Sequence, residues 1–232
     1  MLLGKGVMIN WTNAAPEDRP RYDAWQSHEH TPGRLAIPGF LRGRRCIAVF
    51  PEKADRQFLT LYEVDALEVL TSAAYLAKAN DPSPLTRATT PVVRDSVRGL
   101  ARVRASYGPG VGGCALTLRF DPQPRAGSEA ALETYLTRDA LPVIAQRADI
   151  CGAHWIVADP DASAMKPVER QGRAVTLPNW IVMIEGMTPQ AVTQAGDALL
   201  SNAQLIAHGC APAIIRDVYT LQYLHAAKGV VG

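Results

Sequence analysis

The chain has 232 residues, which is enough for one large domain or two small ones. Hydrophobic residues make up 47% of it and charged residues 20%, as in soluble globular proteins, and a net charge of +2 without a basic tract gives no reason to expect a nucleic-acid partner. The sequence shows neither a signal peptide nor an apolar run near the roughly 18 residues that a membrane span needs, so we expect a cytoplasmic protein without membrane contact.

The first half of the chain predicts six elements in the order β-α-β-β-α-β. A β-rich run opens it, and a helix follows that stops at Pro38-Gly39. An alternating apolar strand precedes an alanine- and leucine-rich helix. The predicted strands are 6–11, 40–50, 57–64 and 100–107, and the predicted helices are 17–37 and 66–79.

The second half repeats this order after the link GPGVGG at residues 108–113. Ser128 is a plausible N-cap for one helix, and Thr188 with Pro189 begins another that Gly209 ends. The predicted strands are 114–120, 152–158, 180–185 and 214–224, and the predicted helices are 128–147 and 188–208.

The two halves also correspond residue by residue at a few places. A shift of about 110 residues sets Trp25 over Tyr135 and Pro32 over Pro142, and a shift of about 122 sets Glu63 over Glu185. The recurring glutamate predicts a structural ion pair. We therefore predict an α+β fold of two tandem ferredoxin-like repeats, residues 1–110 and 111–232, whose antiparallel sheets pack into one α/β barrel. Pairing with a second subunit is the alternative way to cover the two sheets.

The first half resembles the dimeric α/β barrel superfamily, and within it the EthD-like group. The resemblance rests on the helix motif WQSHEHTP, the turn PGF and the strands RGRRCIAVF and FLTLYEVD. It implies a cleft between sheet and helices that takes a small, often aromatic organic molecule. Related members include isomerases, cyclases, cofactor-free monooxygenases and, more distantly, haem proteins.

His28, Glu29 and His30 form the cluster that could carry chemistry. His28 and His30 are two residues apart and point away from each other on a regular helix, so they cannot share one metal ion. We expect no metal and no cofactor. His30 is the candidate general base, assisted by His28 or Glu29, because imidazole titrates near neutral pH. The alternative is a helix-end histidine that caps carbonyl groups.

Six further residues are candidates for binding the substrate. Trp25 could line the cleft, and a tyrosine on a strand could donate to a carbonyl oxygen, although a packed core tyrosine is the simpler interpretation. Arginines at the start of the second strand could bind an anion, or they could form a solvated face. The candidates are Trp25, Arg34, Arg42, Arg44, Arg45 and Tyr62. The long segment 159–178 is expected to cover a site or to contact a second subunit.

The sequence therefore predicts a small-molecule enzyme of the dimeric α/β barrel type, acting by histidine acid/base chemistry on an aromatic or carbonyl-containing molecule. A non-catalytic binding module is the alternative, and haem binding through His154 is a third. Cys46, Cys114, Cys151 and Cys210 form no CxxC pair, so we expect free thiols. The substrate, the reaction and the oligomeric state are left open, with a homodimer as one expected assembly.

Overall fold

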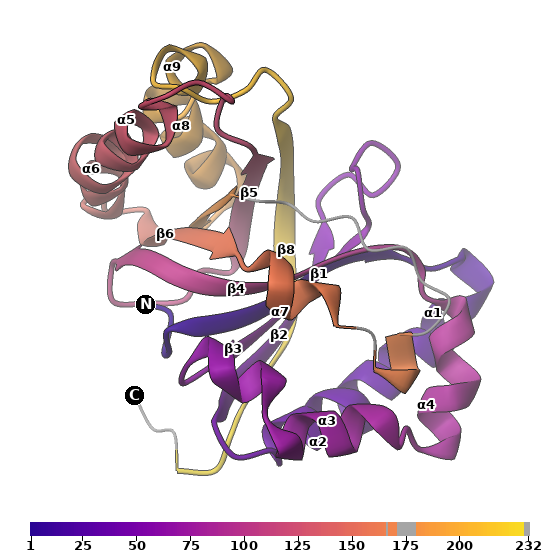
Figure 1. The fold of residues 1–232 in the computed structure, drawn as a ribbon. Coiled ribbons are helices and arrows are strands. Elements are labelled where there is room, and N and C mark those ends of the chain that lie inside the picture. Colours follow the sequence, from indigo (N-terminus) through magenta and orange to yellow (C-terminus); the bar gives the residue numbers. More distant parts are fainter. Residues whose placement is uncertain (166, 171–179, 230–232) are drawn as a thin grey trace.

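The computed structural model describes residues 1–165, 167–170 and 180–229 of the chain. In this part, eight strands close into one antiparallel barrel in the order β1-β3-β2-β8-β5-β7-β6-β4 (Figure 1). The strands are β1 Gly6–Asn13, β2 Phe40–Ala48, β3 Phe58–Val64, β4 Arg94–Tyr107, β5 Cys114–Phe120, β6 Ile150–Ala158, β7 Trp180–Gly186 and β8 Ile215–Ala226.

The barrel consists of two four-stranded sheets with the same strand order. The first is β4-β1-β3-β2 and the second is β8-β5-β7-β6, and the pairs β2–β8 and β4–β6 join them. The predicted fold is confirmed, with the two sheets closing on each other inside one chain. Closure leaves no sheet edge unpaired among the described strands. The division of the chain at residue 110 stays a prediction.

The first-half helices lie together on one outer side of the barrel (Figure 1). They are η1 Pro16–Asp18, α1 Arg19–Trp25, the π segment η2 Gln26–His30, α2 Thr31–Leu35, η3 Leu67–Thr71, α3 Ala73–Asn80, α4 Pro84–Thr89 and η4 Thr90–Val92. The predicted helix 66–79 is divided, because the Ser72 hydroxyl accepts from the backbone N–H of Tyr75 and starts α3. Ser83 starts α4 in the same way within a segment predicted to be a plain connection.

The main second-half helices lie on the opposite side (Figure 1). The helical elements of this half are α5 Ser128–Thr134, the π segment η5 Tyr135–Ala140, α6 Leu141–Ala145, α7 Pro160–Ala164, η6 Val168–Arg170, α8 Pro189–Leu199 and α9 Asn202–Ala207. The predicted helix 188–208 is in fact two helices. Ser201 and Gln204 form a capping box that begins α9. No helix in the described ranges is both long enough and apolar enough to cross a bilayer.

The alternation of each strand divides its side chains between the barrel interior and a helix-covered outer face. Interior positions hold an apolar cluster that includes Trp11, Leu61, Ile156 and Met183. The outer face of the second half packs under its helices as a second large apolar cluster. The outer face of the first half is divided into two smaller clusters. Polar side chains lie on the strands in that half.

Candidate functional site

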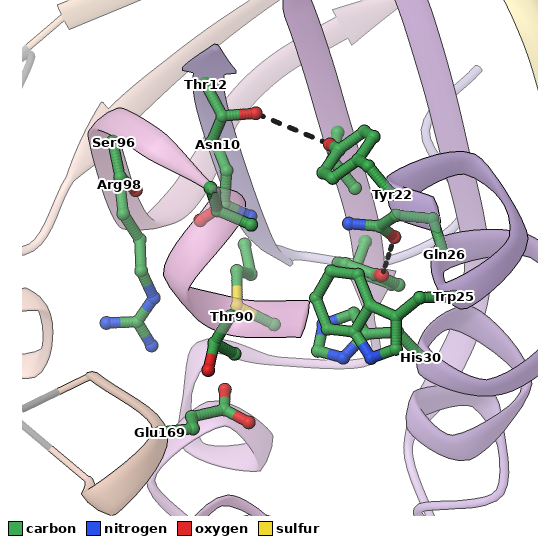
Figure 2. A pocket seen from close by; sticks show the side chains of 14 residues that line it. Asn10, Thr12, Tyr22, Trp25, Gln26, His30, Thr90, Ser96, Arg98 and Glu169 are labelled. Carbon is green, nitrogen blue, oxygen red and sulfur yellow. Dashed lines mark hydrogen bonds between the residues drawn. The ribbon is translucent and has the colours of Figure 1, made fainter. Parts of the chain in front are cut away.

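A small cavity lies outside the barrel, between the first-half sheet and its helices (Figure 2). Its floor comes from β1, β3 and β4, and its walls come from α1, the η2 segment, η4 and η6. The cavity has a volume of about 50 Å³. Its lining residues are Met8, Asn10, Thr12, Tyr22, Trp25, Gln26, His30, Thr60, Tyr62, Thr90, Val93, Ser96, Arg98 and Glu169.

The cavity exists where outward strand positions carry polar side chains. Asn10 pairs with Thr60 across β1 and β3 and with Arg98 across β1 and β4. The corresponding register in the second half pairs Leu118 with Val182. That second-half face is filled by a buried apolar cluster that contains Leu118, Phe120, Val182 and Ile184. The duplicated fold therefore keeps a polar site under one set of helices and an apolar core under the other.

His30 lies in the cavity wall, at the end of the η2 segment. Its ring lies against the buried Trp25 ring, with a centroid separation of 4.3 Å, and meets the Tyr62 ring edge-on at 6.1 Å. The predicted candidates Trp25, His30 and Tyr62 are thus brought together at one cavity. Their roles in binding or catalysis stay predictions.

The π-helical form of this segment belongs to the fold. Each repeat has one, and each is followed closely by a proline, Pro32 or Pro142. A proline within a helix clashes with the carbonyl four residues earlier, and a wider turn relieves that clash. Because the described part of the second half has the same feature over an apolar cluster, the π segment alone does not indicate function.

Hydrogen bonds fix the side chains beside His30. The Tyr62 hydroxyl donates to Oε1 of Gln26 at 3.3 Å and lies 3.2 Å from the Thr31 hydroxyl. Burial raises the pKa of Tyr62, against the hydrogen bond to Thr31, so its phenol stays protonated. Because Oε1 of Gln26 accepts from the hydroxyls of Tyr62 and Thr31, its NH₂ group is directed to the cavity (Figure 2).

The other two members of the predicted cluster do not line this cavity. His28 is exposed. The Glu29 carboxylate accepts hydrogen bonds from the hydroxyls of Ser83 and Thr86, at the start of α4. Thr86 in turn accepts the indole N–H of Trp25 at 3.0 Å. Glu29 thus ties α4 to the η2 segment and holds Trp25 through Thr86.

Arg34 lies behind the cavity, where it pairs with Glu169. Glu169 belongs to the long segment that was expected to cover a site. It lines the inner cavity and also an outer hollow of about 530 Å³, which shares Thr90 and Val93 with the inner cavity. The expected cover is supported for the described part of that segment, while residues 166 and 171–178 lie outside the described residues.

The arginines of β2 lie elsewhere. Arg42 makes two hydrogen bonds of 2.8 Å to the Glu63 carboxylate, and Arg44 binds Glu185 at 2.5 Å inside the barrel. Arg45 projects to the other side, where it lies 3.3 Å from the Asp23 carboxylate. None of the three lines the cavity with His30. The predicted structural ion pair of the recurring glutamates is confirmed, since Arg44 contacts both Glu63 and Glu185.

The described residues do not fit haem. His154 is fully buried inside the barrel, and both of its ring nitrogens are occupied, Nδ1 by the Ser106 hydroxyl at 2.9 Å and Nε2 by Glu185 at 3.1 Å. The cavity beside His30 is small and has polar walls, whereas a porphyrin needs a large apolar slot. We therefore derive no chemistry through haem.

Several lining residues were not predicted, among them Asn10, Gln26, Thr60, Arg98 and Glu169. A signal for some of them was present in the sequence. The outward letters of GVMINW and LTLY are partly polar, whereas those of CALTLRF and WIVMIE are apolar. A position-by-position comparison of the two repeats would have found this difference. Arg98 lay outside the predicted strand 100–107, because β4 begins at Arg94.

No protein-family model and no curated protein matches this sequence. Solved structures do match it over nearly the full length of both chains. An anthrone oxidase-like protein is 13% identical with a TM-score of 0.64, over 98% of this chain and 94% of that one. A candidate monooxygenase from Fusobacterium nucleatum subsp. nucleatum is 7% identical with a TM-score of 0.62, over 97% and 95%. A haem-binding protein from Thermus thermophilus is 12% identical with a TM-score of 0.51, over 95% and 92%.

These similarities concern the fold. Each match spans both repeats, so the chain shares with these proteins a complete dimeric α/β barrel within one polypeptide. The fold class predicted from the sequence is thereby confirmed.

Proposed function

We propose that the chain is a small-molecule enzyme in which His30 performs general acid/base catalysis in the first-half cavity. The substrate is a small organic molecule with a carbonyl group, aromatic or aliphatic. One observation carries the proposal: polar groups surround His30 on a sheet face whose counterpart in the second half is apolar. Buried polar groups cost free energy unless they are paired, so a face that serves only packing has no use for them.

The geometry supports removal of a proton from a carbon next to a carbonyl. His30 accepts the proton, and the rigid Trp25 ring at 4.3 Å holds the imidazole plane. The electron pair of the broken C–H bond moves to the carbonyl oxygen and forms an enolate. The Gln26 NH₂ group, fixed by Tyr62, can donate to that oxygen.

Isomerisation, cyclisation and cofactor-free oxygenation share this first step. The structures of similar fold include an anthrone oxidase-like protein and a candidate monooxygenase, and this favours oxygenation by analogy of fold. The proposed mechanism assigns no role to His28 and Glu29, which were predicted as helpers and do not line the cavity. It likewise assigns no role to the arginines of β2.

The test compares His30→Ala with His28→Ala. His28 is exposed two residues away and makes a matched control for composition and fold. Oxygen uptake and absorbance are followed with anthrone, which consumes one O₂ to give anthraquinone and water, and with small 1,3-diketones. We expect turnover by the wild type and by His28→Ala, and a loss of about 100-fold or more in His30→Ala. A folded His30→Ala protein with unchanged turnover would remove His30 from the mechanism.

A non-catalytic binding module is the second candidate, favoured by the small inner volume of about 50 Å³. It would show a ligand-dependent rise in melting temperature without turnover in any of these assays.

Membership of the EthD-like group, a cytoplasmic location and a homodimer also remain parts of the proposal. The first rests on the WQSHEHTP and PGF motifs. The location is supported by the free cysteines Cys46, Cys114, Cys151 and Cys210.

A further inference from the structure

Arg98 is a buried cation without a carboxylate partner in the described part of the chain. Only 2% of the surface of Arg98 is exposed to solvent. Nη2 donates to the Tyr75 hydroxyl at 2.9 Å, and Nη1 has no hydrogen-bond partner among the described residues. A buried charge without an opposite charge destabilises a folded protein, so this arrangement calls for a reason.

The second half shows how the same position can be satisfied. Arg98 pairs with Asn10 across β4 and β1, and Arg216 pairs with Leu118 across β8 and β5, so the two arginines occupy equivalent places. Arg216 lies 3.1 Å from Asp197 of α8 and donates to the Leu200 carbonyl. The helix that corresponds to α8 is α3, and it presents Tyr75 to Arg98 where α8 presents a carboxylate.

Arg98 lies across the cavity from Trp25, Gln26 and His30 (Figure 2). The other charged pair nearby, Arg34 with Glu169, is already neutral as a pair. The guanidinium of Arg98 therefore gives the cavity one positive charge that the described residues do not balance. A planar guanidinium with free N–H groups matches a carboxylate, which accepts two parallel hydrogen bonds.

We infer that Arg98 is an anion-binding residue and that the ligand of this cavity is a small organic carboxylate. The inference rests on the proposed function only in placing the ligand in this cavity. The carboxylate contacts Arg98, and the rest of the molecule extends toward His30 or, through the boundary at Thr90 and Val93, into the outer hollow. Tyr75 positions the guanidinium from behind.

The first experiment needs no variant. Isothermal titration measures binding of acetate and benzoate, which differ in size, and of their neutral counterparts acetamide and benzamide. We expect at least one acid to bind, and its amide to bind about 10- to 100-fold more weakly, as for a hydrogen-bonded charge. Equal binding of acid and amide, or binding of neither acid, overturns the inference. Inorganic phosphate that binds more tightly than both acids overturns the carboxylate assignment.

The second experiment uses Arg98→Met with Arg216→Met as the matched control. We expect Arg98→Met to lower the affinity for the acid about 10- to 100-fold and Arg216→Met to leave it unchanged. Without ligand, Arg98→Met should melt at the wild-type temperature or higher, since it removes an unpaired buried charge. Arg98→Lys keeps the charge and should keep part of the affinity. Undiminished binding by Arg98→Met contradicts the inference.

The inference and the proposed function fail in different ways. His30→Ala should lose turnover but keep the preference for the acid over its amide, because that preference comes from Arg98. If the acids bind through Arg98 and no carbonyl compound is turned over, the anion site stands and the enzymatic proposal falls. If a neutral carbonyl compound is turned over through His30 while the acids do not bind, the anion site falls and the enzymatic proposal stands.

Discussion

Single residues inside the barrel show how charge can be buried when it is fully matched. Arg44 lies 2.5 Å from Glu185 and 3.1 Å from Glu63, and Arg42 binds both carboxylate oxygens of Glu63. The Arg44 charge, acting against desolvation by burial, holds the pKa of Glu185 well below its usual range. This chain of alternating charges is absent from the described part of the cavity outside the barrel, where Arg98 has no such partner.

Replacing Arg44 with methionine should therefore destabilise the protein strongly. Glu185 would be left in the interior without its nearest cation, and breaking a buried pair in this way costs about 3–5 kcal/mol. Arg102→Met is the control, because Arg102 pairs with Glu68 at 3.0 Å on the exposed surface, where such a pair contributes about 0–1 kcal/mol. Urea unfolding followed by circular dichroism measures both. Similar losses of unfolding free energy in the two variants would show that the interior ion pair stabilises the protein no more than the surface pair does.

For single residues, the sequence predicted which side chains share a strand face, but it did not predict whether that face lies inside or outside the barrel. Periodicity separated Arg42 and Arg44 from Arg45, and Tyr62 from Glu63, as the structure has them. Alternation, however, does not tell which face of a strand lies inside a barrel. The predicted anion-binding arginines of β2 thus lie in the barrel interior and near α1. Arg98, which has no carboxylate partner among the described residues, is on β4.

Among the elements, α2 and β2 approach each other closely at Gly43. A Cβ atom there would lie 2.6 Å from Cγ2 of Thr31 and 3.1 Å from the Tyr62 ring. Thr31 and Tyr62 share the hydrogen bonds with Gln26 that shape the cavity beside His30. The packing of α2 on the sheet is therefore coupled to the geometry of the site.

We expect Gly43→Ala to lower the free energy of unfolding by about 1–3 kcal/mol, as overpacking does, and to reduce both turnover and acid binding because Thr31 and Tyr62 must move. Gly99→Ala on β4 is the matched control. A Cβ atom at Gly99 would make ordinary contacts of 3.6 Å with Ile9 and 3.7 Å with Ala158. If turnover and acid binding respond alike to the two substitutions, the coupling between α2 and the site is refuted.

Element order was predictable because the helical and strand periods differ and because Gly and Pro mark the boundaries. The breaks within helices were harder to see. Ser72 and Ser201 each stand in an apolar, helix-forming stretch, and only the cap hydrogen bonds show that a new helix begins there. The π segments are likewise set by tertiary packing and a following proline, which single-sequence periodicity does not resolve.

At the scale of the whole molecule, duplication lets one chain divide two tasks. The second half buries an apolar outer face under α5, α6 and α8, and this cluster includes Leu136, Trp155 and Trp180. The first half keeps polar and charged groups in the equivalent place. Stability can thus come mainly from one repeat and the barrel interior. The other repeat tolerates the cost of Arg98, a buried cation with no carboxylate partner among the described residues. The order of elements is the same in both halves, so topology does not reveal which half carries the polar outer face. Comparing corresponding residues of the two halves does.

The barrel interior also makes the stability of the whole molecule depend on pH. Burial lowers the pKa of His154, against the opposing effect of Glu185, so the folded protein keeps this imidazole neutral. As pH falls through the ordinary histidine value of about 6.5, the unfolded chain takes up a proton that the folded state does not. This histidine therefore supports stability fully above a pH of about 6.5 and progressively less below it, by at most about 1.4 kcal/mol per pH unit.

His154→Gln should flatten the loss of stability between about pH 7 and pH 5, because glutamine keeps a hydrogen-bonding side chain between Ser106 and Glu185 but does not titrate. The free energy of unfolding is measured in urea at half-unit steps of pH. His225→Gln is the control, since His225 is exposed near the end of β8 and its substitution should leave the slope unchanged. A slope in His154→Gln equal to that of the wild type would mean that the interior histidine does not set the acid limit.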